Sequence, residues 1–282
     1  MMKLIAIDLD GTLLNTDLSI SKRNAEAILQ AQKAGHIVTI CTGRSMHDTQ
    51  KFLTNAGLDI PFIAGNGAVV FYEKVLHNEV IPENVLIEVI DLFRRKETYY
   101  EIFTEDGILF DEIGMAYFEQ ENKELHKQDH REQELMQHEI EKMKKENYFL
   151  VVPDCKKIDL TSFKPYKIYS LTFSDKKMKK MKEILKLKND LSFTSGSSLT
   201  LEVGNKNVSK GNALKILADH LQIAPENLVA IGDNLNDLSM FRIAGTSIAM
   251  GNALEEVKAC ADHVTKNFDE DGVAYALEKF IL

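Results

Sequence analysis

An apolar run near the start of the chain, followed by a pair of carboxylates, constrains the fold more than any other feature. The run reads KLIAID over residues 3–8, and Asp10 and Gly11 come within the next three positions. A continuous apolar stretch of this length is typical of a parallel strand that is covered on both faces. We therefore expect a buried parallel strand whose carboxyl end carries polar groups.

The segments after this strand alternate between helical and extended patterns. We expect helices over 21–34 and 46–55, with an apolar strand between them. The alternation returns late in the chain, where the strand NLVAIGD at 227–233 precedes a final helix at 270–280. Such alternation predicts an α/β fold with a doubly wound parallel-sheet, Rossmann-like core, in which ligands bind beyond the carboxyl ends of the strands.

The middle of the chain has a different character. It combines a hairpin, a highly charged helical region at 111–146 and a lysine-rich helix, and no strand in it ends in paired acids. We therefore predict an inserted α/β cap domain over 83–194 that selects the substrate. The catalytic core is predicted to comprise residues 1–82 and 195–282.

Composition excludes several classes of protein. The 282 residues are 44% hydrophobic and 27% charged, which is typical of a folded globular chain, and the net charge of −9 disfavours nucleic acid as a partner. Three cysteines lie far apart without CxxC spacing, which favours a reducing compartment over a disulfide or zinc framework. We expect a cytoplasmic protein with no membrane partner; no pattern in the sequence sets its oligomeric state.

Two clusters of acidic residues follow apolar strands. Asp8 and Asp10 end the first strand, and a second cluster, Gly232 to Asp237, ends the strand LVAI. One carboxylate could attack phosphorus or bind a metal while another moves a proton, and oxygen ligands from both clusters suit Mg²⁺. The alternatives are a strand-end Asp that caps the next turn, and a calcium loop, whose acid and Gly spacing the second cluster does not match.

Two further motifs present groups that suit phosphate. Thr42, Gly43 and Arg44 follow the strand HIVTI and offer a hydroxyl, a backbone N–H and a guanidinium. Ser209 and Lys210 stand at a predicted helix start, where an ammonium and free N–H groups can face an anion. Each motif alone is a weak signal.

Together, in this order, the motifs DLDGT, TGR, SKG and GDNLND resemble the four motifs of the haloacid dehalogenase superfamily. The stretch Gly65-Asn66-Gly67-Ala68 and the α/β insertion are similar to its Cof-type branch, and the resemblance covers essentially the whole chain. It implies a phosphoric monoester hydrolase that uses Mg²⁺.

The resemblance also implies roles for the acidic residues. Asp8 would be the nucleophile and a Mg²⁺ ligand. Asp10 would be the general acid and base, and its backbone carbonyl would bind the metal. Asp233 would complete the metal ligands, while Asp237 would act behind them on metal-bound water or Lys210.

The remaining motif residues are implied to bind the substrate. Thr42 and Lys210 would hold the transferred phosphoryl group, and Asn236 would lie near it. Leu9 and Gly43 would offer backbone N–H groups. The guanidinium of Arg44 is expected to bind phosphate oxygens.

We therefore predict a magnesium-dependent phosphatase that hydrolyses small phosphomonoesters, such as sugar phosphates, through an aspartyl-phosphate intermediate. A mutase would use the same residues, and a non-catalytic sensor of a phosphorylated metabolite would keep the fold. His126 and His130 have the spacing of metal ligands, but their charged neighbours indicate a solvated helix face. Cys41 ends an apolar strand and is expected to be buried and unreactive.

Overall fold

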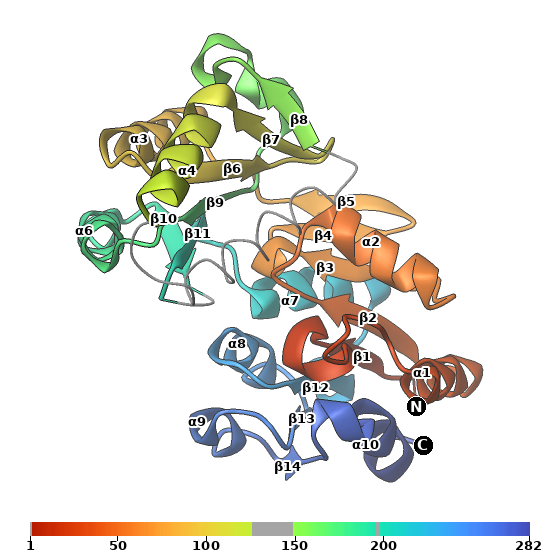
Figure 1. Ribbon diagram of the computed structural model, residues 1–282. Helices are drawn as coiled ribbons and strands as arrows, with labels where there is room; N and C mark the ends of the chain where they lie inside the picture. Colours follow the sequence, from red (N-terminus) through yellow and green to blue (C-terminus); the bar gives the residue numbers. More distant parts are fainter. Residues whose placement is uncertain (1, 126–148, 196–197) are drawn as a thin grey trace. The chain divides into compact units, whose positions relative to one another are not determined.

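The computed structural model describes residues 2–125, 149–195 and 198–282, which form two compact units (Figure 1). The core unit comprises Met1–Asn78 and Val208–Leu282, and the inserted unit comprises Glu79–Asn207. None of the helices in the described ranges is both long and apolar enough to cross a membrane.

The core unit is built on one mostly parallel sheet. Across this sheet the described strands run in the order β14 (His263–Val264), β13 (Thr246–Ala249), β12 (Leu228–Gly232), β1 (Leu4–Ile7), β2 (Ile37–Cys41), β3 (Phe62–Ala64), β4 (Val69–Tyr72) and β5 (Lys74–Asn78). Strands β14 to β3 pair in parallel, and β4 and β5 extend the sheet as antiparallel strands. The predicted doubly wound α/β fold is confirmed. Strand β5 was not predicted, because its sequence KVLHN has only two apolar residues.

The chain reverses its path across the sheet between β1 and β12. From β1 it continues outward through β2 and β3, whereas from β12 it continues the other way through β13 and β14. Because crossovers between parallel strands are right-handed, the two paths place their helices on opposite faces of the sheet. Ile7 pairs with Ile231, so β1 and β12 end at nearly the same level. Ligands of doubly wound sheets bind beyond such a point.

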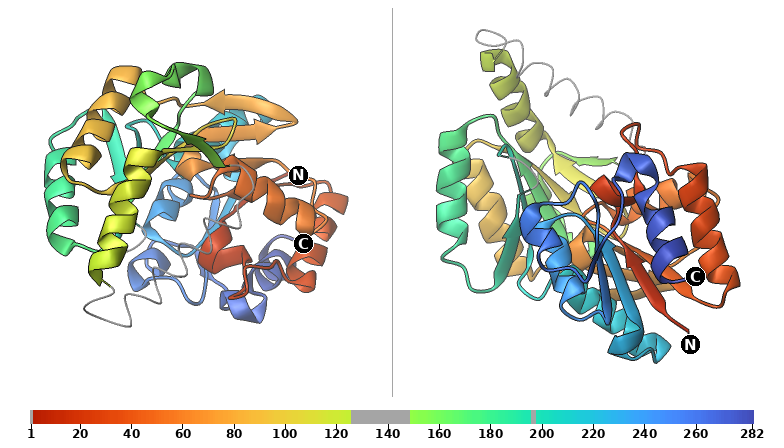
Figure 2. Two further views of the ribbon diagram at one scale, coloured as in Figure 1. Left: turned by 45° about the horizontal axis from the view of Figure 1, so that its top comes forward. Right: turned by 90° about the horizontal axis from the view of Figure 1, so that it is seen from below.

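Six helices of the core unit lie among the described residues. They are α1 (Lys22–Lys33), α2 (Met46–Asn55), α7 (Lys210–Leu221), α8 (Leu238–Phe241), α9 (Glu255–Lys258) and α10 (Gly272–Phe280). Helix α1 packs against α10 and α7 packs against α8 (Figure 2). Ser21, Ser45 and Ser209 cap α1, α2 and α7, each accepting a hydrogen bond from a backbone N–H in the first turn.

The inserted unit is a sheet with helices on it. Its described strands run in the order β10 (Leu191–Thr194), β11 (Thr200–Asn205), β9 (Lys167–Leu171), β6 (Tyr99–Phe103), β7 (Ile108–Asp111) and β8 (Phe149–Val152). Helices α3 (Glu83–Arg95) and α6 (Asp175–Leu185) pack their apolar faces into one core with Ile168 and Val203. Met178 and Met181 lie in that core, as predicted for the inner face of the lysine-rich helix.

Helix α4 (Glu112–Leu125) contributes a second, smaller cluster in the inserted unit. There Phe118 packs with Tyr99 and Leu171, which point away from the first core. The predicted helical region at 111–146 includes α4. Its remainder, with His126 and His130, lies outside the described residues.

The limits of the inserted unit differ from the predicted 83–194. Strand β11 pairs with both β10 and β9, so residues 198–207 belong to this sheet and not to the core. At the other end, Ile81 donates its backbone N–H to the carbonyl of Pro165, in the same unit, at 2.8 Å. Strand periodicity alone does not show with which sheet a strand pairs.

Candidate active site

The turn after β1 brings the first acidic motif against the second. The backbone N–H of Asp8 donates to Ile231 O at 2.9 Å and so extends the pairing of β1 with β12. Gly11 has φ +78°, and a Cβ at this position would lie 2.6 Å from Oδ2 of Asp233. Only glycine therefore allows the turn to approach Asp233 this closely.

Lys210 lies buried between two carboxylates. Its Nζ is 2.5 Å from Oδ1 of Asp8 and 2.5 Å from Oδ1 of Asp237. The side chains of Lys210 and Asp237 are 1% and 0% exposed, so water does not screen these contacts. The other oxygen of Asp237 accepts the backbone N–H groups of Asp233 and Asn234 at 2.9 and 3.0 Å. Asp237 thus fixes both the lysine and the loop that carries Asp233.

Burial and charge shift the protonation equilibria of this cluster. Burial raises the pKa of Asp8 well above its ordinary value, and the nearby Lys210 only partly offsets this. Burial and the charge of Asp237 likewise raise the pKa of Asp233. Burial acts to lower the pKa of Lys210, but Asp237 and Asp8 outweigh it and the pKa is raised. The lysine stays charged, while the two acids carry unfavourable buried negative charge.

The acidic cluster has the chemistry of a Mg²⁺ site. Ligand oxygens of Asp8, Asp233 and Asp237 lie within 4.8 Å of one another. Asp237 uses both oxygens, Asp8 uses Oδ1 for Lys210, and Asp233 accepts the Thr12 hydroxyl on Oδ1. Oδ2 of Asp8 and Oδ2 of Asp233 are therefore the oxygens that can face a cation. A hard divalent ion with oxygen ligands would offset both the cost of burying these negative charges and the repulsion between them. The donors present fit Mg²⁺.

The loop after β2 holds the TGR motif. Thr42 is fully buried; its N–H donates to Ile63 O at 2.8 Å, and its Oγ1 accepts the Arg44 N–H at 3.1 Å. A Cβ on Gly43 would lie 2.9 Å from Oδ1 of Asn66. That Asn has φ +60° and accepts a hydrogen bond from Nδ2 of Asn236 at 3.1 Å.

Arg44 pairs with Asp10. Its Nη2 lies 2.6 Å from Oδ1 of Asp10, and its Nε lies 2.8 Å from Oδ2 and 3.1 Å from Oδ1. The guanidinium also stacks 4.7 Å from the ring centre of Phe52 on α2. The arginine is thus engaged with the acid of the first motif.

The structure brings most of the predicted site residues to the ends of β1, β2 and β12. Leu9 begins the turn after β1 with its side chain buried. Three residues of this region were missed by sequence reasoning. Thr12 donates its hydroxyl to Asp233 at 3.2 Å, Asn252 donates to the Gly11 carbonyl at 2.8 Å, and Asn66 contacts Asn236. The stretch Gly65-Asn66-Gly67-Ala68 was a signal for Asn66, but it indicated only a turn and a family resemblance, and it gave no role to the side chain.

Cys41 is buried at the end of β2, as predicted. Burial raises the pKa of its thiol far above the ordinary value, so the group stays protonated and unreactive.

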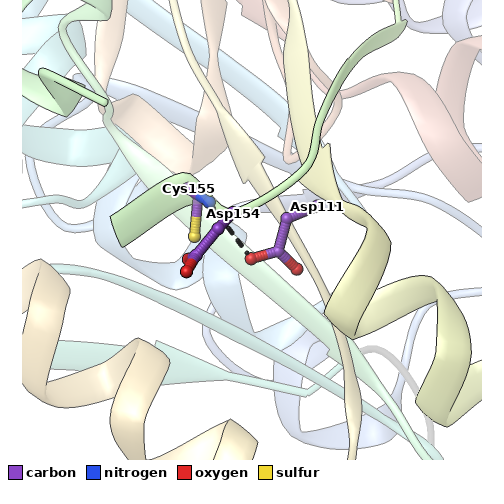
Figure 3. A group of neighbouring side chains, drawn as sticks. All are labelled: Asp111, Asp154 and Cys155. Atoms are coloured by element: carbon purple, nitrogen blue, oxygen red, sulfur yellow. Dashed lines mark hydrogen bonds between the residues drawn. The ribbon is translucent and has the colours of Figure 1, made fainter. Parts of the chain in front are cut away.

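A second acidic group lies in the inserted unit, where Asp111, Asp154 and Cys155 come together (Figure 3). Arg94 donates to both aspartates, with 2.7 Å to Asp154. Oδ2 of Asp111 also accepts the Tyr100 hydroxyl at 2.8 Å and the Cys155 N–H at 3.2 Å. Burial raises the pKa of the Cys155 thiol to about 12. With an arginine as its cation and a protonated thiol, this group is a structural network.

Comparison with known proteins decides the family. A model of the haloacid dehalogenase-like hydrolases matches residues 5–277. The chain belongs to this family. The predictions of the superfamily and of an enzyme of the phosphoric monoester hydrolase class are confirmed.

Several relatives of this hydrolase align over nearly their whole length. The chain is 37% identical to 5-amino-6-(5-phospho-D-ribitylamino)uracil phosphatase YwtE of Bacillus subtilis, covering 99% of this chain and 98% of the relative. It is 32% identical to phosphatase YwpJ of the same organism, covering 99% and 100%. Among solved structures, a haloacid dehalogenase-like hydrolase from B. subtilis has a TM-score of 0.84 at 31% identity, covering 99% and 100%.

Proposed function

We propose that this hydrolase is a magnesium-dependent phosphatase that cleaves small phosphomonoesters through an aspartyl phosphate on Asp8. The observation that carries the proposal is the buried contact of Lys210 with Asp8 and Asp237 beside Asp233. A carboxylate held by a charged lysine at a sheet switch point is oriented for attack, and the lysine offers positive charge to phosphoryl oxygens.

The reaction has two steps on the chain's own residues. An oxygen of Asp8 forms a bond to phosphorus while the bond to the leaving oxygen breaks, and Asp10 gives that oxygen its proton. Asp10 then takes a proton from water as the water attacks the phosphorus, which releases phosphate and restores Asp8. Thr42, Lys210 and Asn236 hold the phosphoryl group, with the backbone N–H groups of Leu9 and Gly43.

The metal would be held by Asp8, Asp233 and the carbonyl of Asp10. Mg²⁺, when bound, supplies charge neutralisation and Lewis acidity at the phosphoryl oxygens. Asp237 orients the metal-binding residues indirectly, through its contacts with Lys210 and with the loop that carries Asp233.

The substrate is proposed to be a small phosphorylated metabolite. The name of the relative YwtE makes 5-amino-6-(5-phospho-D-ribitylamino)uracil a candidate, alongside sugar phosphates. We assign the choice of leaving group to the inserted unit, because all four motifs lie outside residues 79–207. A cytoplasmic location is part of the proposal, supported by three cysteines without a disulfide.

The variant Asp8→Asn tests the nucleophile. An amide is nearly isosteric but is a poor nucleophile and metal ligand, so release of phosphate from p-nitrophenyl phosphate with Mg²⁺ should fall to background. Acid-quenched protein should carry a hydroxylamine-sensitive phosphoryl label only when Asp8 is present. Asp59→Asn, an exposed Asp of the same unit, is the matched control and should retain activity.

Three outcomes would contradict the proposal. Turnover by folded Asp8→Asn would exclude this nucleophile. Binding of phosphorylated metabolites without release of phosphate by the unmodified chain would indicate a sensor. Transfer of phosphate to a second hydroxyl of a sugar phosphate, in preference to water, would indicate a mutase.

A further inference from the structure

The Arg44–Asp10 pair joins two residues that belong to different sequence motifs. One edge of the guanidinium reaches both oxygens of the Asp10 carboxylate, at 2.6 to 3.1 Å. Paired contacts of this kind fix orientation as well as distance, since the arginine fork and the carboxylate are both planar. The side chain of Asp10 is 49% exposed and that of Arg44 is 16% exposed.

Arg44 also has anchors in the core that do not involve Asp10. Its backbone N–H donates to Oγ1 of Thr42, and its carbonyl accepts the Gly65 N–H at 2.8 Å. The ring of Phe52 lies 4.7 Å from the guanidinium on α2. Asp10, in contrast, lies on a turn next to Gly11 and is half exposed. The better-anchored partner therefore sets the orientation of the other.

We infer that Arg44 is a positioning residue for Asp10, whose bidentate contact holds the proton-transferring carboxyl in its working orientation. This inference rests on the proposed acid and base role of Asp10. It differs from the interpretation from sequence, in which the guanidinium binds phosphate oxygens of the substrate.

The pairing is compatible with proton transfer. A carboxylate offers about four lone-pair sites, so contacts along one edge leave another site for a proton. The O–H bond of Asp10 breaks as its proton passes to the leaving oxygen, and the electron pair of the breaking P–O bond accepts it. Arg44 takes no part in that exchange; it restricts the rotamers of a half-exposed side chain.

Two esters with different leaving groups distinguish an Arg44 that positions Asp10 from an Arg44 that binds phosphate. Phenyl phosphate needs protonation of its leaving oxygen much more than p-nitrophenyl phosphate does, and kcat/KM reports the step that forms the aspartyl phosphate. Arg44→Ala should lower kcat/KM for phenyl phosphate about 10- to 100-fold and for p-nitrophenyl phosphate at most about threefold. A phosphate-binding arginine would instead lower both values equally, which would overturn the inference.

Three further variants sharpen the test. Arg44→Lys keeps the charge but not the fork, so it should share the defect of Arg44→Ala with phenyl phosphate. In an Asp10→Asn background, Arg44→Ala should cost at most about twofold more, because residues acting as a unit are not additive. Arg23→Ala removes a similar ion pair, with Glu278, and should behave as wild type.

The outcomes keep the two proposals apart. If Asp10→Asn shows no bias against phenyl phosphate, the acid role of Asp10 fails. If Asp10→Asn shows the bias but Arg44→Ala does not, only the positioning role of Arg44 fails. Thermal unfolding of each variant checks that the comparison is made between folded proteins.

Discussion

Lys210 is a buried cation with two carboxylate partners, so its removal affects both stability and chemistry. Lys210→Met would leave Asp8 and Asp237 buried without their counter-ion, and we expect a loss of about 3 to 5 kcal/mol in the free energy of unfolding. The variant also loses positive charge at the phosphoryl group, so kcat should fall more than KM rises. Urea unfolding and steady-state kinetics with p-nitrophenyl phosphate measure the two effects.

The matched control lies on the same helix. Lys215 forms an exposed pair with Asp219, and Lys215→Met should change stability by less than about 1 kcal/mol. If folded Lys210→Met kept its kcat and only KM rose, Lys210 would serve uniform binding and not the transition state.

For single residues, the sequence indicated a role in the site where the residue belongs to a recognisable motif. Asp8 and Asp233 were expected in one site because strand ends meet at one edge of a parallel sheet, and Lys210 joined them through the resemblance of the motifs to a known family. Thr12 and Asn66 stand in quoted motifs, but their contacts with Asp233 and Asn236 were not predicted, because these depend on how closely two loops approach. Such distances are not encoded by spacing along the chain.

The network of Arg94 joins three elements of the inserted unit. The arginine, on α3, contacts Asp111 at the end of β7 and Asp154 before a short helical turn. Burial acts to raise the pKa of Asp111, but hydrogen bonds from Gly114, Tyr100 and Cys155 outweigh it, so the pKa is lowered. The hydrogen bond from Arg94 is the main cause of the lowered pKa of Asp154.

Arg94→Leu should destabilise the inserted unit by about 3 to 5 kcal/mol, because it leaves the fully buried Asp111 without its cation. Arg95→Leu, at the neighbouring exposed position, is the control and should cost less than about 1 kcal/mol. Urea unfolding monitored by far-ultraviolet circular dichroism measures both. Equal losses of unfolding free energy in the two variants would show that the Arg94 network does not stabilise the inserted unit.

The Arg94 network makes the free energy of unfolding depend on pH. Because the folded pKa values of Asp111 and Asp154 lie below the ordinary value of 3.8, their contribution to stability is complete above that value. It is lost as the pH falls through the lowered values. The difference in unfolding free energy between wild type and Asp111→Asn should therefore shrink as the pH is lowered below about 4.

The positions of helices and strands were predicted more successfully than the pairing of the strands. The amphipathic patterns of 21–34 and 46–55 identified α1 and α2, and the apolar strands identified the parallel sheet. Strand β11 fell within the predicted core because the predicted insertion ended at residue 194. Its pairing with β9 and β10 results from packing between distant segments, which no local pattern reveals.

For the whole molecule, the limits of the inserted unit determine how it can be exchanged. Replacing residues 79–207 by the corresponding unit of a similar phosphatase keeps each sheet intact, and we expect a folded chimera with a changed ranking of phosphorylated metabolites. Mg²⁺ dependence and the need for Asp8 should persist. A screen of phosphorylated metabolites measures the ranking; an unchanged ranking in a folded chimera would exclude the inserted unit as the specificity element.

The control for this exchange is a chimera in which the limits predicted from the sequence, 83–194, are used. A replacement of 83–194 separates β10 from β11, which pair through Leu191 and Asn205 at one end of their hairpin. That chimera should fail to fold or should unfold at a lower temperature than the exchange of 79–207. Equal stability would show that the hairpin contributes little.

The central position of β1 in the sheet has a consequence for synthesis on the ribosome. This strand is translated long before one of its two neighbours, β12, which begins only at Leu228. While residues 79–207 are being added, β1 has an open edge, and open edges pair readily with other chains. We expect the nascent chain to depend on chaperone protection until β12 emerges, whereas the inserted unit, whose strands come from one continuous segment, can fold as soon as it is released.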